Sequence, residues 1–451
     1  MKYLRHIFLL ILSSLSLFLA TCKKDSPVVS PVEPPQYQQS IFLSVADSGL
    51  TEVYLRLTMT DTLSPRGFAV LRNNTQILSG TLFSKETTIV DTTAQFNTRY
   101  SYKVFRVENG VHKDSSAVVS ATTLDTTSHE YNWKIVTLGG ASTSVLYDVK
   151  IFNKDNIWAV GEIFTNDSTG NLDQVPYSIV HWDGNSWSLK RLYYRHSDTE
   201  NFLIAPIRGI AADTPDTVWF AAGSIFRLTN NSSISEIVFS RFLLNSVNGT
   251  IERVFQDRAR KIYGVGDDGS VVIGKNSSWK VVETGTLQPI TDIYGSFDPI
   301  SKKEEILCIG SSKYHYTNKV IYKIKDDGLE AQTLDAVNGS MISIWSIPGR
   351  SYYIVGNGVY NKNMLKNMWM KENSFAPYYK NIVRGNSENN VFVAGDFRML
   401  SHFNGKSWKH YSEFGQGQQS GMLLGMDVKE KMVVVVGSVG TGEAIIIIGE
   451  K

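Results

Sequence analysis

NIWAVG, at residues 156–161, is the first copy of a strand pattern that recurs along the chain and decides its fold. In each copy an apolar or alternating run ends in a glycine. The seven copies end at Gly161, Gly223, Gly266, Gly310, Gly356, Gly395 and Gly437. The spacings between these glycines are about 62, 43, 44, 46, 39 and 42 residues. A period of this length is typical of proteins built from repeated four-stranded sheets.

The segments around each copy repeat as well. A strand such as LYDVKIF (residues 146–152) precedes it, and a strand ending in a turn, such as IVHWDG (179–184), follows it. A further strand often opens with Ser-Trp, as in SWKVVET (278–284). Asp-Gly and Asn-Gly pairs supply the positive φ of tight hairpins, so the third and fourth strands should be antiparallel neighbours. The sequence therefore predicts an all-β fold in which residues 130–451 form a seven-bladed β-propeller.

The last repeat is incomplete. After its glycine only EAIIIIGEK, residues 443–451, remains, which supplies a third strand but no fourth. Residues 132–139, NWKIVTLG, precede the first repeat and match the Trp-Lys pattern of the fourth strands. We expect this segment to pair with the last strand and to close the propeller, because a closed ring leaves no long sheet edge unpaired. The VWAVG and HWDGxSW motifs resemble repeats of bacterial secreted propellers, a resemblance that indicates fold and not activity.

Residues 38–125 alternate apolar and polar side chains without a helical period, which predicts a separate β domain. The segments 91–93, DTT, and 97–104, NTRYSYKV, resemble bacterial fibronectin type III domains. The resemblance implies a β-sandwich in which a tyrosine at a strand corner bonds to the upstream backbone. Tyr102 fits that position best, and Tyr100 is the alternative. The resemblance to fibronectin type III domains also implies a spacer or binding module, since such sandwiches carry few catalytic groups.

The N-terminus has the pattern of an export signal. Basic residues precede an apolar run at residues 7–20, which is shorter than the roughly 20 residues that span a bilayer. Residues 1–21 are therefore predicted to be a signal peptide. The run ends in Leu-Ala-Thr-Cys, which resembles the lipobox of bacterial lipoproteins and implies that Cys22 carries a lipid. The alternative is an ordinary signal peptide that happens to contain a cysteine.

The segment after the anchor indicates where the protein resides. Residues 22–37 contain the lipid-bearing cysteine and a Pro-rich stretch, which predicts an extended linker between membrane and folded domains. The Cys-Lys-Lys-Asp run resembles lipoproteins of the Bacteroidota, and Lys23 stands where an aspartate would resemble an inner-membrane retention signal. The resemblance implies a lipid-anchored protein of the cell envelope at the outer membrane, facing the periplasm or the cell surface.

Composition and motifs argue against several classes of function. The formal net charge is +2 over 451 residues, with no basic cluster beyond the N-terminal segment, so no nucleic-acid partner is expected. Cys308 lies in an apolar run and is expected to be a buried thiol. Without a metal-binding histidine pair, a phosphate loop or a nucleophile elbow, we expect no enzyme, metal or cofactor. Asp167, Asn171 and Asp173 alternate like half a calcium loop, but the distal glutamate is missing and a solvated loop is favoured.

Long insertions supply the candidate binding site. In a propeller the loops between second and third strands lie on the same face as the connections between blades. Residues 162–176, 193–206 and 311–318 are insertions of these kinds. They place aromatic and basic side chains, which often carry interface energy, on one rim. These candidate ligand-binding residues are Tyr193, Tyr194, Arg195, His196, Tyr314, His315 and Tyr316.

The leading hypothesis is therefore a membrane-anchored, non-catalytic binding or scaffold protein whose ligand is a protein or a glycan. A polysaccharide-active enzyme with an unrecognised propeller site is one alternative. A structural part of an envelope or secretion assembly is the other. The sequence favours no oligomeric state.

Overall fold

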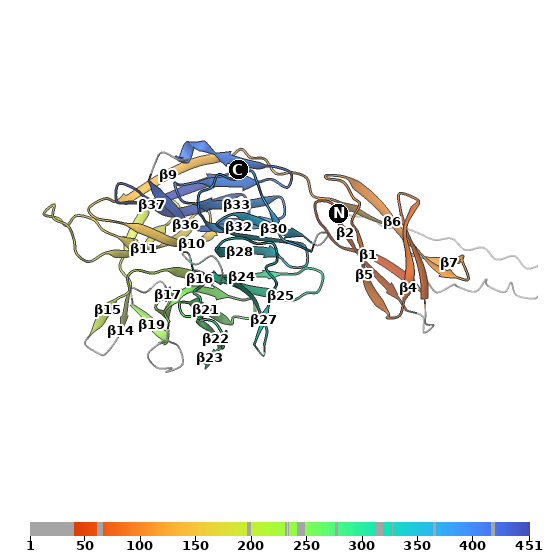
Figure 1. The fold of residues 1–451 in the computed structure, drawn as a ribbon, viewed down its shortest axis with the longest axis horizontal. Coiled ribbons are helices and arrows are strands. Elements are labelled where there is room, and N and C mark those ends of the chain that lie inside the picture. The colour runs from red at the N-terminus through yellow and green to blue at the C-terminus, as the bar shows by residue number, and fades with distance from the viewer. Residues whose placement is uncertain are drawn as a thin grey trace, which may run out of the picture.

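The computed structural model describes residues 40–60, 66–195, 200–230, 232, 234–240, 249–275, 278–312, 319–326, 328–363, 367–415 and 420–451. The predicted signal peptide, Cys22 and the linker lie outside these residues. Over the described ranges the chain forms nine β-sheets and one 3-10 turn, Ser412–Phe414, which confirms the all-β prediction. Within the same ranges, no helix is long and apolar enough to cross a membrane. Figure 1 shows an N-terminal body beside a larger C-terminal one.

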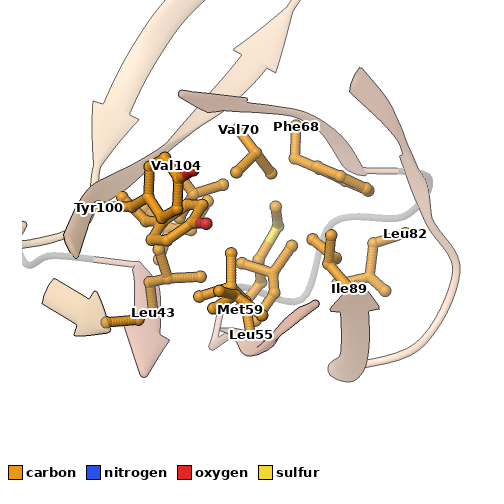
Figure 2. Close-up of a cluster of buried hydrophobic side chains, with 14 of the residues drawn as sticks. Leu43, Leu55, Met59, Phe68, Val70, Leu82, Ile89, Tyr100 and Val104 are labelled. Carbon is orange, nitrogen blue, oxygen red and sulfur yellow. The ribbon is translucent and has the colours of Figure 1, made fainter. Parts of the chain in front are cut away.

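The N-terminal body is a sandwich of two sheets. One sheet contains β1 (Ile41–Ser48), β2 (Val53–Met59) and β5 (Glu86–Asp91). The other contains β4 (Thr75–Leu82), β3 (Arg66–Arg72), β6 (Arg99–Glu108), β7 (Val111–Ser115) and β8 (Val119–Thr122). Val70 and Val104 of the second sheet point toward Leu55 and Met59 of the first, and all four side chains are fully buried (Figure 2). Alternation along the strands thus places one apolar face of each sheet in a shared core.

The two tyrosines of β6 have different partners. The Tyr100 hydroxyl accepts a hydrogen bond from the Gln95 N–H at 2.9 Å, which is the upstream backbone contact expected of a corner tyrosine. The Tyr102 hydroxyl instead donates to the Asp91 carboxylate at 2.8 Å. The preference for Tyr102 was therefore wrong, because Asp91 lies within reach of that hydroxyl and the backbone bond is left to Tyr100.

The C-terminal body consists of the other seven sheets, each named here from its inner to its outer strand. The first three are β10 (Val145–Asn153), β11 (Asn156–Ile163), β12 (Tyr177–Trp182), β13 (Trp187–Lys190); β16 (Gly209–Thr214), β17 (Thr217–Ala222), β18 (Ser224–Thr229), β19 (Ile234–Phe239); and β20 (Ile251–Gln256), β21 (Ile262–Gly266), β22 (Val271–Lys275), β23 (Ser278–Val281). The next two are β24 (Ile290–Phe297), β25 (Glu304–Ser311), β26 (Lys319–Ile324), β27 (Leu329–Ala331); and β28 (Met341–Ile347), β29 (Ser351–Gly356), β30 (Val359–Asn363), β31 (Met370–Lys371). The last two are β32 (Lys380–Ser387), β33 (Asn390–Gly395), β34 (Leu400–Phe403), β35 (Trp408–Tyr411); and β36 (Gly421–Lys429), β37 (Met432–Val439), β38 (Glu443–Glu450), β9 (Asn132–Gly139).

The last sheet joins distant parts of the sequence. β9 pairs antiparallel with β38 along its whole length, from Gly139 opposite Glu443 to Asn132 opposite Glu450. The predicted pairing of residues 132–139 with the last strand is therefore confirmed, and Figure 1 shows orange β9 beside the blue C-terminal strands. Each innermost strand contacts that of the next sheet, and β36 contacts β10.

Apolar side chains fill the space between neighbouring sheets. The cluster between the first and last sheets, for example, joins Leu146 and Val180 to Val434 and Ile446. Cys308 of β25 is fully buried in such a cluster, where burial raises the pKa of its thiol to about 12. The prediction that Cys308 is a buried core thiol is therefore confirmed.

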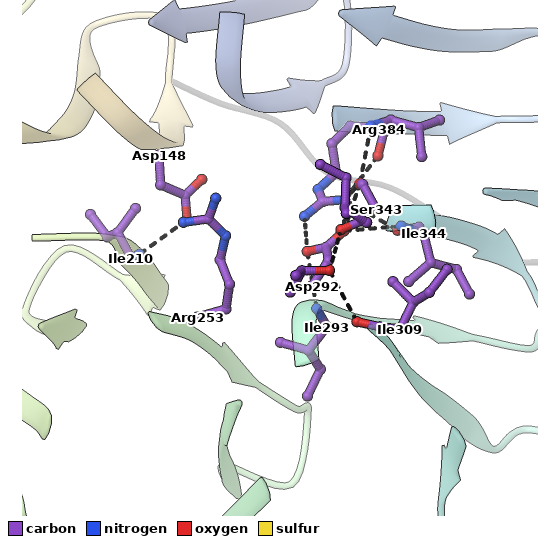
Figure 3. Close-up of polar contacts among 12 residues, drawn as sticks. Asp148, Ile210, Arg253, Asp292, Ile293, Ile309, Ser343, Ile344 and Arg384 are labelled. Atoms are coloured by element: carbon purple, nitrogen blue, oxygen red, sulfur yellow. Dashed lines mark hydrogen bonds and ion pairs between the residues drawn. The ribbon is translucent and has the colours of Figure 1, made fainter. Parts of the chain in front are cut away.

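Charged side chains of the innermost strands form a clasp at the centre of these sheets (Figure 3). The Arg384 guanidinium donates to both oxygens of Asp292, at 2.7 and 2.9 Å. Asp292 also accepts from the Ser343 hydroxyl at 2.6 Å and the Ile344 N–H at 3.0 Å. Burial acts to raise the pKa of Asp292, but the charge and hydrogen bonds of Arg384 outweigh it and hold this pKa below its usual value. The clasp therefore ties β24, β28 and β32 together through one ionised carboxylate.

The sandwich rests on the turns that join first and second strands in the fourth to sixth C-terminal sheets. Arg350 of the β28–β29 turn pairs with Asp47 and lies 4.4 Å from the ring centre of Tyr54. Arg56 donates to the carbonyl of Ile300 in the β24–β25 turn at 3.2 Å. Because successive turns of an antiparallel sheet lie at opposite ends, the turns between second and third strands occupy the face away from the sandwich. We call this the distal face.

The connection from the sandwich to β9 is fastened to the sixth sheet. The Thr127 N–H donates to the Asn404 carbonyl at 3.1 Å, and the Asn389 side-chain amide donates to the Asp125 carbonyl at 2.7 Å. The Tyr411 hydroxyl donates to the His129 carbonyl at 2.8 Å. We call these contacts the linker clamp, and they hold the residues that directly precede β9.

Glu388 makes the docking of the sandwich sensitive to pH. Its side chain is 7% exposed and accepts a 3.2 Å hydrogen bond from the Leu50 N–H. Burial and the nearby Glu52 raise the pKa of Glu388 to about 7, despite the opposing charge of Arg350. A carboxyl whose pKa is higher in the docked state favours docking at low pH, and this contribution is lost as pH rises toward 7.

We therefore expect Glu388→Gln to raise the thermal midpoint of the full chain at pH 8 and to leave it nearly unchanged at pH 4.5. The free energy of unfolding of Glu388→Gln should exceed that of the parent by an amount that grows between these two pH values to about 3 kcal/mol. Differential scanning calorimetry across this range measures it. The exposed Glu413, replaced in the same way, is the control. A difference between Glu388→Gln and the parent that does not vary with pH would contradict the assignment.

Candidate functional site

The predicted insertion at residues 193–206 forms a hairpin and not an open loop. β14 (Tyr193–Arg195) pairs antiparallel with β15 (Asn201–Leu203) and parallel with β19, so the insertion adds two strands to the outer edge of the second C-terminal sheet. Tyr194 and Phe202 stand directly opposite each other in this hairpin, an aromatic cross-strand pair that stabilises a sheet. Tyr193, Tyr194 and Arg195 are thus held by backbone pairing.

The three described candidate residues differ in what they expose. The Tyr194 ring lies 5.4 Å from Phe226 and 5.8 Å from Phe202, partly buried against the core between the first two sheets. The Tyr193 carbonyl accepts from the Ser235 hydroxyl at 3.1 Å. Arg195 is exposed, and Phe202, which the sequence did not single out, is 45% exposed. His196, Tyr314, His315 and Tyr316 lie outside the described residues.

The insertion within the first sheet is fastened to the base of this hairpin. Arg191 pairs with Asp173, donates to the Val175 carbonyl at 2.6 Å and lies 4.1 Å from the ring centre of Tyr177. The two predicted insertions therefore start from neighbouring points of the distal face. In Figure 1 a yellow loop extends on the side opposite the sandwich.

The acidic residues of this insertion bond within their own loop. Asp167 accepts hydrogen bonds from the Thr169 hydroxyl at 2.7 Å, the Thr169 N–H at 2.8 Å and the Asn171 N–H at 3.0 Å, which lower the pKa of its carboxyl. Asp173 is engaged by Arg191 and by the Val175 N–H. Within the described part of the chain, no group of three His, Cys, Asp or Glu residues could hold a metal ion.

A turn that the sequence did not single out stands at the same face. Phe397 and Arg398, between β33 and β34, have φ angles of 56° and 55°. This left-handed conformation costs an aromatic or long side chain about 1–2 kcal/mol per residue, so Asn or Gly normally occupies it. The equivalent β21–β22 turn carries Asp268 and Gly269 at φ 51° and 67°. A comparison of this turn with the Asp268-Gly269 turn in the sequence could have shown that Phe397 and Arg398 are unusual there.

The same hydrogen bonds hold both turns. The Met399 N–H donates to the Asp396 carbonyl at 3.2 Å, and the Ser270 N–H donates to the Asp267 carbonyl at 3.0 Å. The backbone therefore imposes one geometry on two different sequences. Strained residues of this kind persist where the surrounding structure enforces them, and they cluster at binding and catalytic sites.

The strained turn displays an aromatic and basic surface, which we call the Phe397 patch. Phe397 and Met422 are 40% and 38% exposed, and the Tyr378 ring lies 4.8 Å from that of Phe397. The Phe397 N–H donates to the Gly421 carbonyl at 2.9 Å, which joins the sixth sheet to the seventh. The Arg398 Nε is buried and has no hydrogen-bond partner in the part of the chain that the structure describes, and burial lowers the pKa of its guanidinium. The patch therefore offers apolar rings beside a cation that an acidic group could neutralise.

Comparisons with known proteins identify the architecture. No family model and no curated protein matches the chain. The solved chain described as "YCF48 bound to D1 peptide" superposes with a TM-score of 0.52 at 11% identity, over 72% of this chain and 100% of that chain. The WD40 β-propeller domain of Doa1 gives 0.51 and 11%, over 71% of this chain and 97% of that chain.

The C-terminal sheets form a β-propeller. At such low identity the likeness concerns the fold alone, and it agrees with the packing of each innermost strand against the next. The propeller presents its short first turns to the sandwich and leaves the distal face, with the hairpin and the Phe397 patch, uncovered by it.

Proposed function

We propose that the seven C-terminal sheets are the blades of one closed propeller and that the N-terminal sandwich is a fibronectin type III-like spacer. The pairing of β9 with β38 and the contact of β36 with β10 support closure. The backbone bond of Tyr100 and the two-sheet core support the sandwich assignment. The lipid on Cys22, the signal peptide and an outer-membrane location belong to the same proposal and rest on the sequence.

We further propose that the protein is a non-catalytic binding module whose distal face takes a protein segment. The observation that carries this is the Phe397 patch, where a strained turn exposes an aromatic ring beside an arginine whose buried Nε has no hydrogen-bond partner among the described residues. Aromatic residues and Arg supply most of the binding energy of protein interfaces. An acidic group next to an apolar side chain would match the patch. The YCF48 propeller, which was solved with the D1 peptide bound, supports a peptide-like ligand by analogy of fold.

Replacing the strained turn by its unstrained counterpart tests this proposal. The double variant Phe397→Asp, Arg398→Gly copies the β21–β22 turn into the sixth blade. Because the strain is removed, we expect unfolding to become less favourable by about 1–2 kcal/mol. A photoreactive side chain introduced at Met422 should crosslink a partner in the parent and lose it in the variant.

The control is Asp268→Asn, which keeps a turn residue that tolerates positive φ and should change neither stability nor crosslinking. A double variant that is no more stable than the parent would show that the turn is unstrained. Crosslinking that survives the exchange would contradict the Phe397 patch as the binding surface.

A further inference from the structure

A cavity of about 380 Å³ lies in the groove between the second and third blades, away from the distal face. Trp219 of β17 and Trp279 of β23 form part of its wall, with Arg227 and Gln256 beside them. Both tryptophans border the apolar core between these blades, and neither is fully buried. The volume lies within the range of pockets that hold small ligands, which combine aromatic walls with a few polar groups.

Three polar atoms at this cavity have no partner in the described protein. They are the indole Nε1 of Trp219, the amide oxygen of Gln256 and the guanidinium Nε of Arg227, each buried without a hydrogen bond. The rest of the Arg227 guanidinium is engaged by Glu236. Buried polar groups are nearly always satisfied, so three such atoms around one cavity indicate a site that a polar ligand completes. Two of them donate and one accepts.

The first blade provides an internal comparison. Trp158 occupies the same register, since it pairs with His181 as Trp219 pairs with Arg227. Its indole N–H donates to the Asn156 side chain at 3.0 Å, and the residue is 2% exposed. Thr217 stands two residues before Trp219, where the first blade has Asn156. The chain therefore satisfies one indole itself and leaves the other, in a residue that lines the cavity, buried without a partner among the described residues.

We propose that this cavity binds a single pyranose unit of a glycan. A pyranose has an apolar C–H face, which suits the tryptophan rings, and a rim of hydroxyl groups that both donate and accept. One hydroxyl can accept from the Trp219 N–H, and another can donate to the Gln256 amide oxygen. Arg227 supplies a second donor to the same rim. An aliphatic ligand would leave all three atoms unpaired, which is costly in a desolvated site. This site is separate from the Phe397 patch, so it goes beyond the proposed function and does not depend on it.

Titration calorimetry with linear hexasaccharides of glucose, mannose, N-acetylglucosamine and galacturonic acid tests the proposal on the folded protein. We expect at least one of them to bind with a dissociation constant below about 10 mM. Trp219→Phe keeps an aromatic ring but removes the N–H, and should weaken binding about tenfold or more. Thr217→Asn supplies the cap that the first blade has. It changes one lining residue, Thr217, but leaves both tryptophans, Arg227 and Gln256 in place, and should weaken binding similarly.

Trp158→Phe is the matched control, because it removes an N–H that the chain already satisfies, and the sugar affinity should stay unchanged. Thermal melts verify that each variant is folded. Absence of binding by all four hexasaccharides would overturn the proposal. So would binding that Trp219→Phe and Thr217→Asn both leave intact, since the sugar would then occupy another surface. Neither result would bear on crosslinking at the Phe397 patch.

Discussion

Deletion of residues 130–139 is expected to lower the thermal midpoint of the propeller by about 10 °C or more and to cause aggregation. β9 supplies the outer strand of the last blade, and its Trp133 packs 4.9 Å from Tyr411 and 5.0 Å from Phe414. Without β9, the backbone edge of β38 would be open beside the apolar run Ile445–Ile448. An unpaired apolar edge of this kind is a template for pairing between chains.

Calorimetry and size-exclusion chromatography measure the two parts of this effect. Ile135→Lys is a suitable control, because Ile135 lies on β9 but is 51% exposed. That variant keeps the strand, so it should elute at the same volume as the parent and have a midpoint close to that of the parent. If the deletion leaves the unfolding transition unchanged, β9 does not contribute to closing the last blade.

Replacing Arg384 by Met is expected to destabilise the propeller by about 3–5 kcal/mol. The reason is that Asp292, which is 2% exposed, would lose its cationic partner in a buried setting, where a carboxylate is costly and burial raises its pKa. The pKa of Asp292 is lowered in the native protein, so the clasp stabilises the fold above the ordinary carboxyl pKa and loses this contribution as the pH falls. The destabilisation by Arg384→Met should therefore be largest at neutral pH and smaller near pH 3.

Urea denaturation at pH 7 and at low pH measures this prediction. The double variant Asp292→Asn, Arg384→Met removes both charges, and it should recover most of the loss, because the amide can still bond with Ser343. A single variant within about 1 kcal/mol of the parent at pH 7 would mean that solvent reaches Asp292 and replaces the arginine.

The repeat could be predicted from the sequence because each of its strands and turns is specified by neighbouring residues. An apolar strand that ends in Gly161 or Gly395, followed by a turn pair such as Asp183-Gly184, specifies strand length and hairpin position without tertiary information. The role of β9 was also predictable, since a missing outer strand and an extra Trp-Lys strand account for each other.

Other features depend on where the backbone goes in three dimensions. Asp292 and Arg384 form an ion pair across two blade boundaries. Their separation along the sequence does not predict that their side chains are in contact. Tyr100 and Tyr102 share one face of β6, so only the position of Asp91 decides which hydroxyl reaches the backbone. The Phe397 turn has the backbone geometry of the equivalent turns, although Phe397 and Arg398 disfavour positive φ. The conformational preferences of these two residues therefore do not predict the turn.

The exposure of the side chains in the β14–β15 hairpin could not be predicted from the sequence either. The sequence identified Tyr194 as an exposed aromatic because it lies in a polar insertion. Its partners Phe226 and Phe202 come from other strands, and their arrangement turns much of the ring inward. Arg195 is the described residue of this set that stays exposed.

The linker clamp determines how force reaches the propeller. A pull on the sandwich is directed along the chain toward Asn132, the end of β9 that is paired with Glu450. Tension applied at that end alone would separate β9 from β38 one residue pair at a time, which is the direction of pulling that a paired strand resists least. The clamp at Asp125 and Thr127, together with the Arg350 and Glu388 contacts, is expected to transfer the load to the fifth and sixth blades first. If the proposed lipid on Cys22 tethers the chain, we expect that a bound partner could pull on the propeller without separating β9 from β38.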